Sequence, residues 1–300
     1  MHKITTKQFI LILELLILFL FACGCGASEN TRSRSIGLSG VGNARELGGY
    51  SATDGKTVKH GVLLRTAALA NATSEDISRL QDVYHLAVVA DLRMTLEVQP
   101  APDPEIPGAK NLHLKIIDEE AMQKSIAEAQ AEGLDLSNKL EMLKAAIKSG
   151  ILNDQMYIFF LSGKQGKESY GKMFQELLTL PEGRSLLFHC TQGKDRTGCA
   201  AVLILSALGV DENTIMDDFL LTNTFNAELI ESERKMLTEQ GYAGEELDRL
   251  MKAMDEVDPQ YMTNALDWMK KNYGSVTGYI TQELGITDEQ LEELRAKFLE

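Results

Sequence analysis

One short segment constrains the fold more than any other feature of this chain. Residues 189–198 read His-Cys-Thr-Gln-Gly-Lys-Asp-Arg-Thr-Gly, after the apolar run at 185–188 and before an apolar stretch at 200–208 that Gly209 closes. The first run predicts a buried strand and the second a helix with Gly209 as its C-cap. A loop between a strand and a helix can turn its N–H groups inward, beside the positive helix end. The segment therefore predicts an oxyanion-binding cradle.

The residue types in this loop suit transfer of a phosphoryl group. We expect Cys190 to be the nucleophile, because helix N-termini and nearby cations lower thiol pKa values to about 3.5–7.5 and so favour the thiolate. Arg196 can hold two equatorial phosphate oxygens with its planar fork. We expect His189 to organise the loop by hydrogen bonding, and Thr197 to stabilise the sulfur when a phosphocysteine is resolved. The residues expected to bind the phosphate are Thr191, Gln192, Gly193, Lys194, Asp195 and Arg196.

Four further segments accompany the loop. They are Asn-Ala-Arg-Glu-Leu-Gly-Gly at 43–49, Gly-Val-Leu-Leu-Arg-Thr-Ala-Ala-Leu at 61–69, Asp-Leu-Arg at 91–93 with Glu-Val at 97–98, and Asp-Asp-Phe-Leu-Leu-Thr-Asn at 217–223. Together with the loop they resemble the cysteine-dependent protein tyrosine phosphatases. The similarity is to the bacterial tyrosine and dual-specificity branch, which includes secreted mycobacterial and listerial protein and phosphoinositide phosphatases. Glu46 departs from the branch, which has Asp there.

Two aspartates compete to donate the proton that the leaving group needs. Asp91 ends the apolar run 86–90, so a parallel strand would deliver it to the carboxyl edge of the sheet, where open α/β folds bind ligands. The resemblance also implies an acid at this position. Asp195 lies inside the loop beside Arg196, and some lipid phosphatases of the wider superfamily use a loop aspartate. Either residue could instead cap a helix or pair with Arg93.

The charges around the loop bear on the substrate. Lys194 adds a second cation, which suits a phosphoinositide headgroup with several phosphates, although the same lysine would also assist a phosphopeptide or remain solvated. Three arginines could extend a positive basin or be structural, paired with Glu46, Asp91 or Glu97. They are Arg45, Arg65 and Arg93, and we count Arg93 among the supporting residues. The expected partner is a phosphorylated protein or a phosphoinositide.

The sequence favours a phosphatase that acts on phosphate monoesters, chiefly phosphotyrosine, with dual-specificity or phosphoinositide activity as further options. Two alternatives stay open: a catalytically silent phosphate-binding module, and an oxyanion reductase that uses the same loop. Silent relatives usually lose Cys190 or Arg196, both present here, and reductases normally need additional redox cysteines. We expect no metal and no cofactor, because the loop and Arg196 supply the positive charge.

The overall charge limits the partners further. The chain carries a formal net charge of −14 with a pI of about 4.9, so a dianionic substrate requires a local concentration of positive charge. We expect no nucleic-acid binding, since no basic run with interleaved aromatic residues occurs. The sequence sets no oligomeric state.

The N-terminus reads as a lipoprotein signal peptide. Lys3 and Lys7 precede an apolar stretch at 9–22, and Leu-Phe-Ala-Cys at 20–23 resembles the bacterial lipobox. We expect cleavage after residue 22, lipidation of Cys23, a flexible tether over 23–39 and a location on the extracytoplasmic face of the cell membrane. Because Glu14 interrupts the apolar stretch, a simple secretory signal or an uncleaved anchor remains an alternative.

Two cysteines remain in the expected folded body, too few for a disulfide framework. One is Cys190. The other, Cys199, could be a resolving partner for an oxidised Cys190 or a small core residue that packs its helix on the sheet.

The element order predicts one α/β catalytic domain over 40–300, with a central, mostly parallel sheet flanked by helices. Strands are expected near 61–65, 86–92, 111–116 and 185–189, a capping box at Thr73 starts a helix, and the proline-rich stretch 100–108 forms a surface connection. Helical patterns at 118–165 and 225–300 predict an insertion and an extension. The resemblance implies that the insertion is a lid, whereas extra helices that only cover the sheet are the alternative. We expect the extension to brace the body.

Overall fold

A five-stranded sheet forms the centre of the molecule. The structure is a computed structural model that describes residues 34–300 except 121, 125–138 and 149–151. The strand order is β1-β2-β5-β3-β4, and only the β1–β2 pair is antiparallel. The strands are β1 (Arg45–Glu46), β2 (Leu63–Thr66), β3 (Leu86–Asp91), β4 (Lys110–His113) and β5 (Ser185–His189). The predicted mostly parallel α/β fold is confirmed, while β1 is too short to show a strand pattern in the sequence.

The central strand β5 lies between two hydrophobic clusters, one on each face of the sheet. All of its residues are buried, which explains its continuous apolar sequence, since a central parallel strand is covered on both faces. Leu186 and Phe188 belong to the larger core cluster, and Leu187 belongs to the smaller one on the other face. In register, Thr66 of β2 and Asp91 of β3 lie beside His189, so three strands end at one edge.

One face of the sheet is covered by α3 (Ser74–Asp82) and the chain that precedes the sheet. Thr73 and Asp76 form the predicted capping box at the start of α3. The tether prediction is wrong for its last residues, because Ile36 is fully buried in the smaller cluster, and the N–H groups of Ser39 and Gly40 donate to Asp76. Burial of an apolar side chain and these hydrogen bonds hold this segment on the body.

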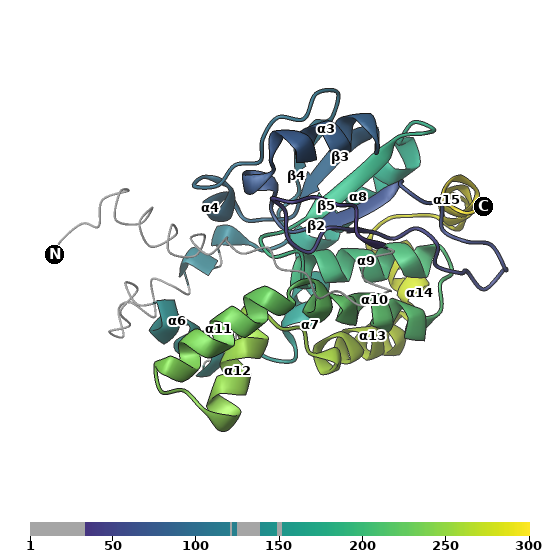
Figure 1. The fold of residues 1–300 in the computed structure, drawn as a ribbon. Coiled ribbons are helices and arrows are strands. Elements are labelled where there is room, and N and C mark those ends of the chain that lie inside the picture. Colours follow the sequence, from purple (N-terminus) through teal and green to yellow (C-terminus); the bar gives the residue numbers. More distant parts are fainter. Residues whose placement is uncertain (1–33, 121, 125–138, 149–151) are drawn as a thin grey trace.

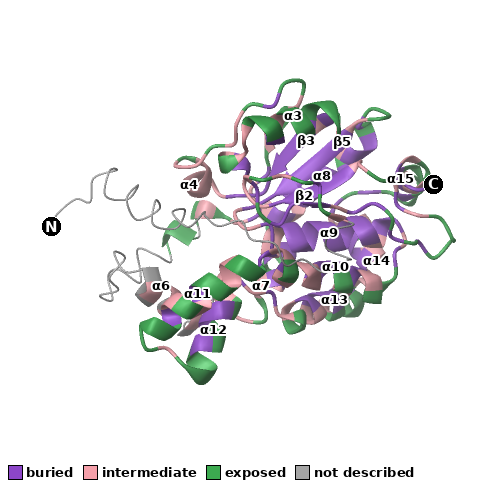
Figure 2. Ribbon diagram, viewed as in Figure 1, coloured by how far each residue is buried: buried purple, intermediate pink, exposed green. Residues whose placement is uncertain are grey.

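Helices cover the other face in a thicker layer (Figure 1). Figure 2 shows α9 as a largely buried helix between the sheet and the outer helices, which explains why its sequence is apolar almost throughout. The helices of this layer are α7 (Met156–Ser162), α8 (Lys164–Thr179), α9 (Asp195–Ala207), α10 (Glu212–Phe225), α13 (Pro259–Tyr273), α14 (Val276–Glu283) and α15 (Asp288–Phe298).

A separate small lobe joins the insertion to the extension (Figure 1). It contains α6 (Lys139–Lys148), α11 (Ala227–Glu239) and α12 (Gly244–Met254). Leu237, Leu250 and Met251 form a satellite hydrophobic cluster, against which Leu140 and Leu143 of α6 pack. Parts of the predicted insertion lie outside the described residues, as do the predicted signal peptide and Cys23. Within the described part of the chain, no helix has the length and apolar character required to cross a bilayer.

Candidate active site

The loop that follows β5 has the form of an anion cradle. Cys190 follows the strand directly and is 2% exposed, and α9 starts at Asp195. Leu92 donates its N–H to the carbonyl of His189, and Ala68 donates to that of Thr191, which fixes the loop between the ends of β3 and β2. None of the N–H groups of residues 191–194 donates to another backbone group of the described chain. Together with the N–H groups of the first turn of α9, they are available to an oxyanion.

Gly193 must be glycine for two reasons. Its φ is 66°, and a Cβ atom there would lie 2.4 Å from the carbonyl oxygen of Thr66. The carbonyl of Gly193 accepts hydrogen bonds from Asn43 Nδ2 at 2.8 Å and from Arg65 Nη2 at 2.9 Å. The residue therefore lets the loop pack closely against β2.

A buried ion triad stands behind the loop. Asp218 of α10 accepts hydrogen bonds from Arg45 Nε at 3.2 Å and from Arg65 Nη1 at 2.6 Å, and all three side chains are at most 1% exposed. Burial alone would raise the pKa of Asp218, but the two guanidinium charges outweigh it and lower the pKa. Arg45 and Arg65 are therefore structural, as one alternative held, although their partner is Asp218 rather than Glu46, Asp91 or Glu97.

Glu46 has a local role in this structure. Its carboxylate accepts a hydrogen bond from the N–H of Gly61 at 2.6 Å and contacts His60 Nδ1 at 3.0 Å. The Glu46 carboxylate thus connects β1 to the turn before β2.

Arg196 is held by Glu97, which the sequence offered as a partner for other arginines. Glu97 of α4 (Thr95–Val98) accepts from Nη1 at 2.5 Å and from Nη2 at 2.8 Å, and it also accepts from the hydroxyl of Thr191 at 2.5 Å. Burial would raise the pKa of Glu97, but the charge of Arg196 outweighs this and lowers it. The Glu97 carboxylate uses one N–H of Nη1 and one N–H of Nη2. The other donors of the Arg196 guanidinium, including Nε–H, can therefore bind a phosphate.

The side chain of Lys194 does not extend into the cradle. Its ammonium donates to the carbonyls of Lys252 at 3.2 Å and of Glu256 at 3.0 Å, and the side chain is 3% exposed. The prediction that Lys194 gives the substrate a second cation is wrong for its side chain. Its charge is held by one carbonyl in the last turn of α12 and one just after the helix. Gln192 likewise donates to Asp255 at 2.6 Å. The extension thus contacts the catalytic loop itself and does more than brace the body.

The two candidate acids have different surroundings. Both oxygens of Asp91 accept from the guanidinium of Arg93, at 2.7–3.1 Å, and the N–H of Arg93 adds a further bond at 3.0 Å. Asp195 accepts one short bond, 2.6 Å from the Tyr157 hydroxyl, while its other oxygen lies 3.6 Å from Lys194 Nζ. Burial and then Asp195 raise the pKa of Tyr157 well above its ordinary value, so this hydroxyl stays protonated and donates.

Two of the predicted supporting residues, His189 and Thr197, lie at the end of β5 and in the first turn of α9. His189 is fully buried and contacts the carbonyl of Cys190. The hydroxyl of Thr197 is buried and has no hydrogen-bond partner among the described residues, as expected for a donor that awaits a charged group in the cradle. Burial, followed by Asp195, raises the pKa of Cys199 well above that of an ordinary thiol, which favours the core role over a resolving thiol.

Asp91, Asp103 and His189 come close enough to suggest a metal site. Their ligand atoms lie within 4.8 Å of one another. The guanidinium of Arg93 lies between the two carboxylates and donates from Nη2 to Asp91 at 2.7 Å and to Asp103 at 2.9 Å. This grouping does not fit a metal ion while Arg93 supplies the positive charge there.

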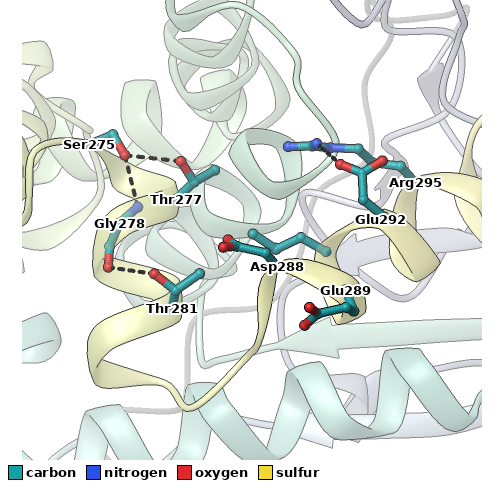
Figure 3. A pocket seen from close by; sticks show the side chains of 9 residues that line it. Ser275, Thr277, Gly278, Thr281, Asp288, Glu289, Glu292 and Arg295 are labelled. Atoms are coloured by element: carbon teal, nitrogen blue, oxygen red, sulfur yellow. Dashed lines mark hydrogen bonds and ion pairs between the residues drawn. The ribbon is translucent and has the colours of Figure 1, made fainter.

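A shallow hollow of about 570 Å³ lies elsewhere, between α14 and α15 (Figure 3). Asp288, Glu289 and Glu292 line it, and its arginine, Arg295, is paired with Glu292. The acidic lining would repel a phosphate, and none of the residues that line it belongs to the catalytic loop.

Comparisons with known proteins agree with this geometry. A family model described as the tyrosine phosphatase family matches residues 36–300. A putative tyrosine-protein phosphatase of Cupriavidus necator is 30% identical over 259 residues, which cover 84% of each chain. The triple specificity protein phosphatase PtpB of Mycobacterium tuberculosis is 26% identical over 248 residues, 75% of this chain and 89% of that protein. A tyrosine-protein phosphatase of Nostoc commune is 24% identical over 242 residues, 78% and 73% respectively.

Proposed function

The chain belongs to the tyrosine phosphatase family, and from that premise we propose that it hydrolyses phosphotyrosine in proteins through a phosphocysteine at Cys190. The observation that carries the proposal is the cradle. Cys190 lies next to N–H groups that no backbone acceptor of the described residues uses, and Arg196 is held in one plane by Glu97. A catalytically silent phosphate-binding module would not need a cysteine nucleophile beside the guanidinium of Arg196.

The chemistry takes two displacements at phosphorus. The Cys190 thiolate attacks in line, so that an S–P bond forms as the ester P–O bond breaks, and an acid protonates the departing oxygen. Water then attacks the phosphocysteine and gives up a proton to the same group, now a base, which releases phosphate and restores the thiolate. Arg196 and the loop N–H groups bind the equatorial oxygens in both steps, where the charge develops.

We assign the acid to Asp195 rather than to Asp91. Arg93 engages both oxygens of Asp91, which leaves that carboxylate little room for a transferable proton. In Asp195 the Tyr157 hydroxyl orients one oxygen, and the side chain keeps 20% of its surface exposed, so the other oxygen can face a leaving group. Asp91 then acts as the partner of Arg93.

The contacts of Lys194 bear on the substrate class. With its ammonium held by carbonyls of residues 252 and 256, this lysine does not supply the extra cation that a phosphoinositide headgroup would use. Two of the relatives are named as tyrosine-protein phosphatases and one as a triple specificity enzyme. We therefore place phosphotyrosine ahead of phosphoinositides and phosphoserine.

A substrate panel tests this assignment. Phosphate release is measured from a phosphotyrosine peptide, the matched phosphoserine peptide, phosphoinositides in vesicles and p-nitrophenyl phosphate. We expect the highest kcat/KM on the phosphotyrosine peptide. Faster release from the phosphoinositides would overturn the substrate class, while no release from any ester would overturn the phosphatase assignment.

The same panel identifies the acid. Asp195→Asn should lower kcat on the phosphotyrosine peptide by about a hundredfold, because general acid catalysis contributes about 10²–10⁴-fold. The loss should be smaller on p-nitrophenyl phosphate, whose less basic leaving group needs a proton less. Asp91→Asn serves as the matched variant, with a similar loss on both esters. If Asp91→Asn instead lost more activity on the peptide than on p-nitrophenyl phosphate, and Asp195→Asn lost activity equally on both, Asp91 would be the acid.

We also propose that the protein is an exported lipoprotein, modified at Cys23 and located on the extracytoplasmic face of the membrane. The proposal rests on Lys3, Lys7, the apolar stretch at 9–22 and the Ala-Cys pair at 22–23. Fractionation with mass spectrometry of the mature N-terminus tests it. An acylated Cys23 in the membrane fraction is expected, and Cys23→Ala should remove the acyl mass. A mature N-terminus elsewhere would contradict the lipobox.

A further inference from the structure

Asn43 opens the segment 43–49 and contacts the catalytic loop with its side chain. The residue is 2% exposed, and its Nδ2 donates to the carbonyl oxygen of Gln192 at 3.2 Å and to that of Gly193 at 2.8 Å. Its Oδ1 accepts a hydrogen bond from Arg45 Nη1. Carbonyl oxygens only accept hydrogen bonds and a guanidinium only donates them, so one orientation of the amide satisfies all three partners. Arg45 thereby keeps the NH₂ group of Asn43 turned toward the loop.

The backbone of Asn43 has an unusual conformation for a residue with a side chain. Its φ is 52°, and in the described part of the chain the one other non-glycine residue with a positive φ is His85. Asn adopts this left-handed conformation more readily than most residues, and strained backbone persists where contacts on several sides hold it. Next to Asn43, the carbonyl of Gly42 accepts from the N–H of Ala67 at 2.9 Å. The segment is therefore fixed beside the end of β2.

The carbonyls of residues 191–194 each have a hydrogen-bond donor. Those of residues 191 and 194 accept from backbone N–H groups, of Ala68 at 3.0 Å and of Gly198 at 2.7 Å. Those of residues 192 and 193 accept from side chains instead. Asn43 donates to both, and Arg65 is a second donor to residue 193 at 2.9 Å. Asn43 thus holds the two central carbonyls of the loop with one side chain.

These hydrogen bonds also set the direction of the loop's N–H groups. In a planar trans peptide, the C=O of one residue and the N–H of the next point in opposite directions. A donor that holds the carbonyl of Gln192 therefore orients the N–H of Gly193, and one that holds the carbonyl of Gly193 orients the N–H of Lys194. Neither N–H donates to a backbone group of the described chain. Both point away from Asn43 and are available to an anion on the other side of the loop.

We propose that Asn43 is a positioning residue, which holds two peptide units of the catalytic loop so that the N–H groups of Gly193 and Lys194 face the phosphoryl oxygens. The inference rests on the proposed function, because it takes the loop as the phosphate-binding site. Donors that are fixed in advance bind an oxyanion without the cost of turning toward it. Without the Asn43 amide these peptide units can rotate, and a rotated unit presents a carbonyl oxygen, which repels the anion.

Two variants of Asn43 separate the amide from the backbone conformation. Glycine adopts positive φ without strain, so Asn43→Gly keeps the backbone and removes the donor. Asn43→Asp keeps the shape and still accepts from Arg45, but it places a carboxylate oxygen against two carbonyl oxygens. In both variants we expect the dissociation constant for tungstate to rise about tenfold to a hundredfold, as for the loss of a hydrogen bond to a charged group.

Calorimetric titration at pH 7 measures this constant, since tungstate is a tetrahedral oxyanion that the enzyme cannot hydrolyse. A folded Asn43→Gly protein that binds tungstate as tightly as the wild type would overturn the proposal, because a positive φ would then be all that this position requires.

His85→Gly is the matched control, because it makes the same kind of change at the other non-glycine residue with a positive φ in the described chain. His85 is exposed and directly precedes β3, whose opposite end, at Asp91, lies beside the end of β5. We expect this variant to keep the wild-type dissociation constant for tungstate. Equal weakening in His85→Gly and Asn43→Gly would contradict a specific role for the Asn43 amide.

A measurement on the wild-type protein needs no variant to fold. Proton–nitrogen-15 NMR spectra are recorded during a titration with tungstate, with the loop signals assigned by selective labelling. We expect the N–H signals of Gly193 and Lys194 to shift with the midpoint of the calorimetric titration. Tungstate binding that leaves both signals in place would mean that these N–H groups do not face the anion, which rules out the proposal.

The outcomes also separate this inference from the proposed function. Tungstate binding that weakens in Asn43→Gly, in a protein that releases no phosphate from any ester, would support the role of Asn43 and contradict the proposed function alone. Phosphate release together with unchanged tungstate binding in Asn43→Gly would retain the proposed function and contradict the role of Asn43.

Discussion

Replacement of Cys190 by Ser is expected to abolish turnover, with kcat on a phosphotyrosine peptide about 10⁶-fold lower, as for the loss of other enzymatic nucleophiles. The reason is chemical, because a serine hydroxyl in this loop is far less ionised than a thiol and is a poorer leaving group when water resolves the intermediate. The cradle and Arg196 remain, so binding of the substrate should persist. Phosphate release gives the rate, and mass spectrometry of acid-quenched protein shows whether residue 190 carries a phosphoryl group.

Cys199→Ala is the matched control for this result. Cys199 is the other cysteine in the described part of the chain, is 1% exposed and lies on the same helix that carries Arg196. We expect this variant to retain both turnover and the phosphocysteine. Turnover that survived in Cys190→Ser would mean that the nucleophile lies elsewhere.

The second large effect concerns stability. Asp218→Asn should destabilise the protein by about 3–5 kcal/mol, because removal of one partner from a buried ion pair leaves uncompensated charge in the interior. Two arginines would be affected, and burial with the charge of Arg45 already lowers the pKa of Arg65 to about 10. Since Arg65 also donates to Gly193, the loop should lose its support and kcat should fall. Urea unfolding at pH 7 measures the difference, with kcat measured in parallel.

The pH dependence of this difference follows from the direction of the shift. Folding lowers the pKa of Asp218, so its contribution is fully present above the unfolded value, about 3.9, and is lost as the pH falls through the lower folded value. The stability gap between wild type and Asp218→Asn should therefore be constant at neutral pH and narrow below about pH 4. Asp217→Asn, an exposed neighbour on the same helix, should change stability by less than about 0.5 kcal/mol. An equal loss in both variants would contradict a role for the triad.

The strand, loop and helix around Cys190 could be predicted because their signals are local. An apolar run long enough for a buried strand, a loop with Gly193 and a second apolar stretch closed by glycine lie next to one another, and the structure has β5 and α9 at those places. The capping box at Thr73 is equally local and is confirmed.

The partners of the charged residues could not be predicted because they depend on tertiary packing. Glu97 reaches Arg196 across a separation of 99 residues, and Asp218 reaches Arg65 across 153. Any of several acidic residues could have paired with these arginines, and only the fold selects among them. Lys194 shows the same limit, since its position in the motif indicates a cation near the loop but not the direction of its side chain.

The contacts between the catalytic loop and the end of α12 have a consequence for folding during synthesis. Gln192 and Lys194 bind residues that lie 58 to 63 positions further along the chain. While the protein is being synthesised, Cys190 and Arg196 therefore leave the ribosome well before the residues that hold their loop. A nascent chain that ends near residue 225 contains all the reacting atoms of the site and lacks this part of its frame. We therefore expect the catalytic loop to gain these contacts only after residues 252–256 have been synthesised.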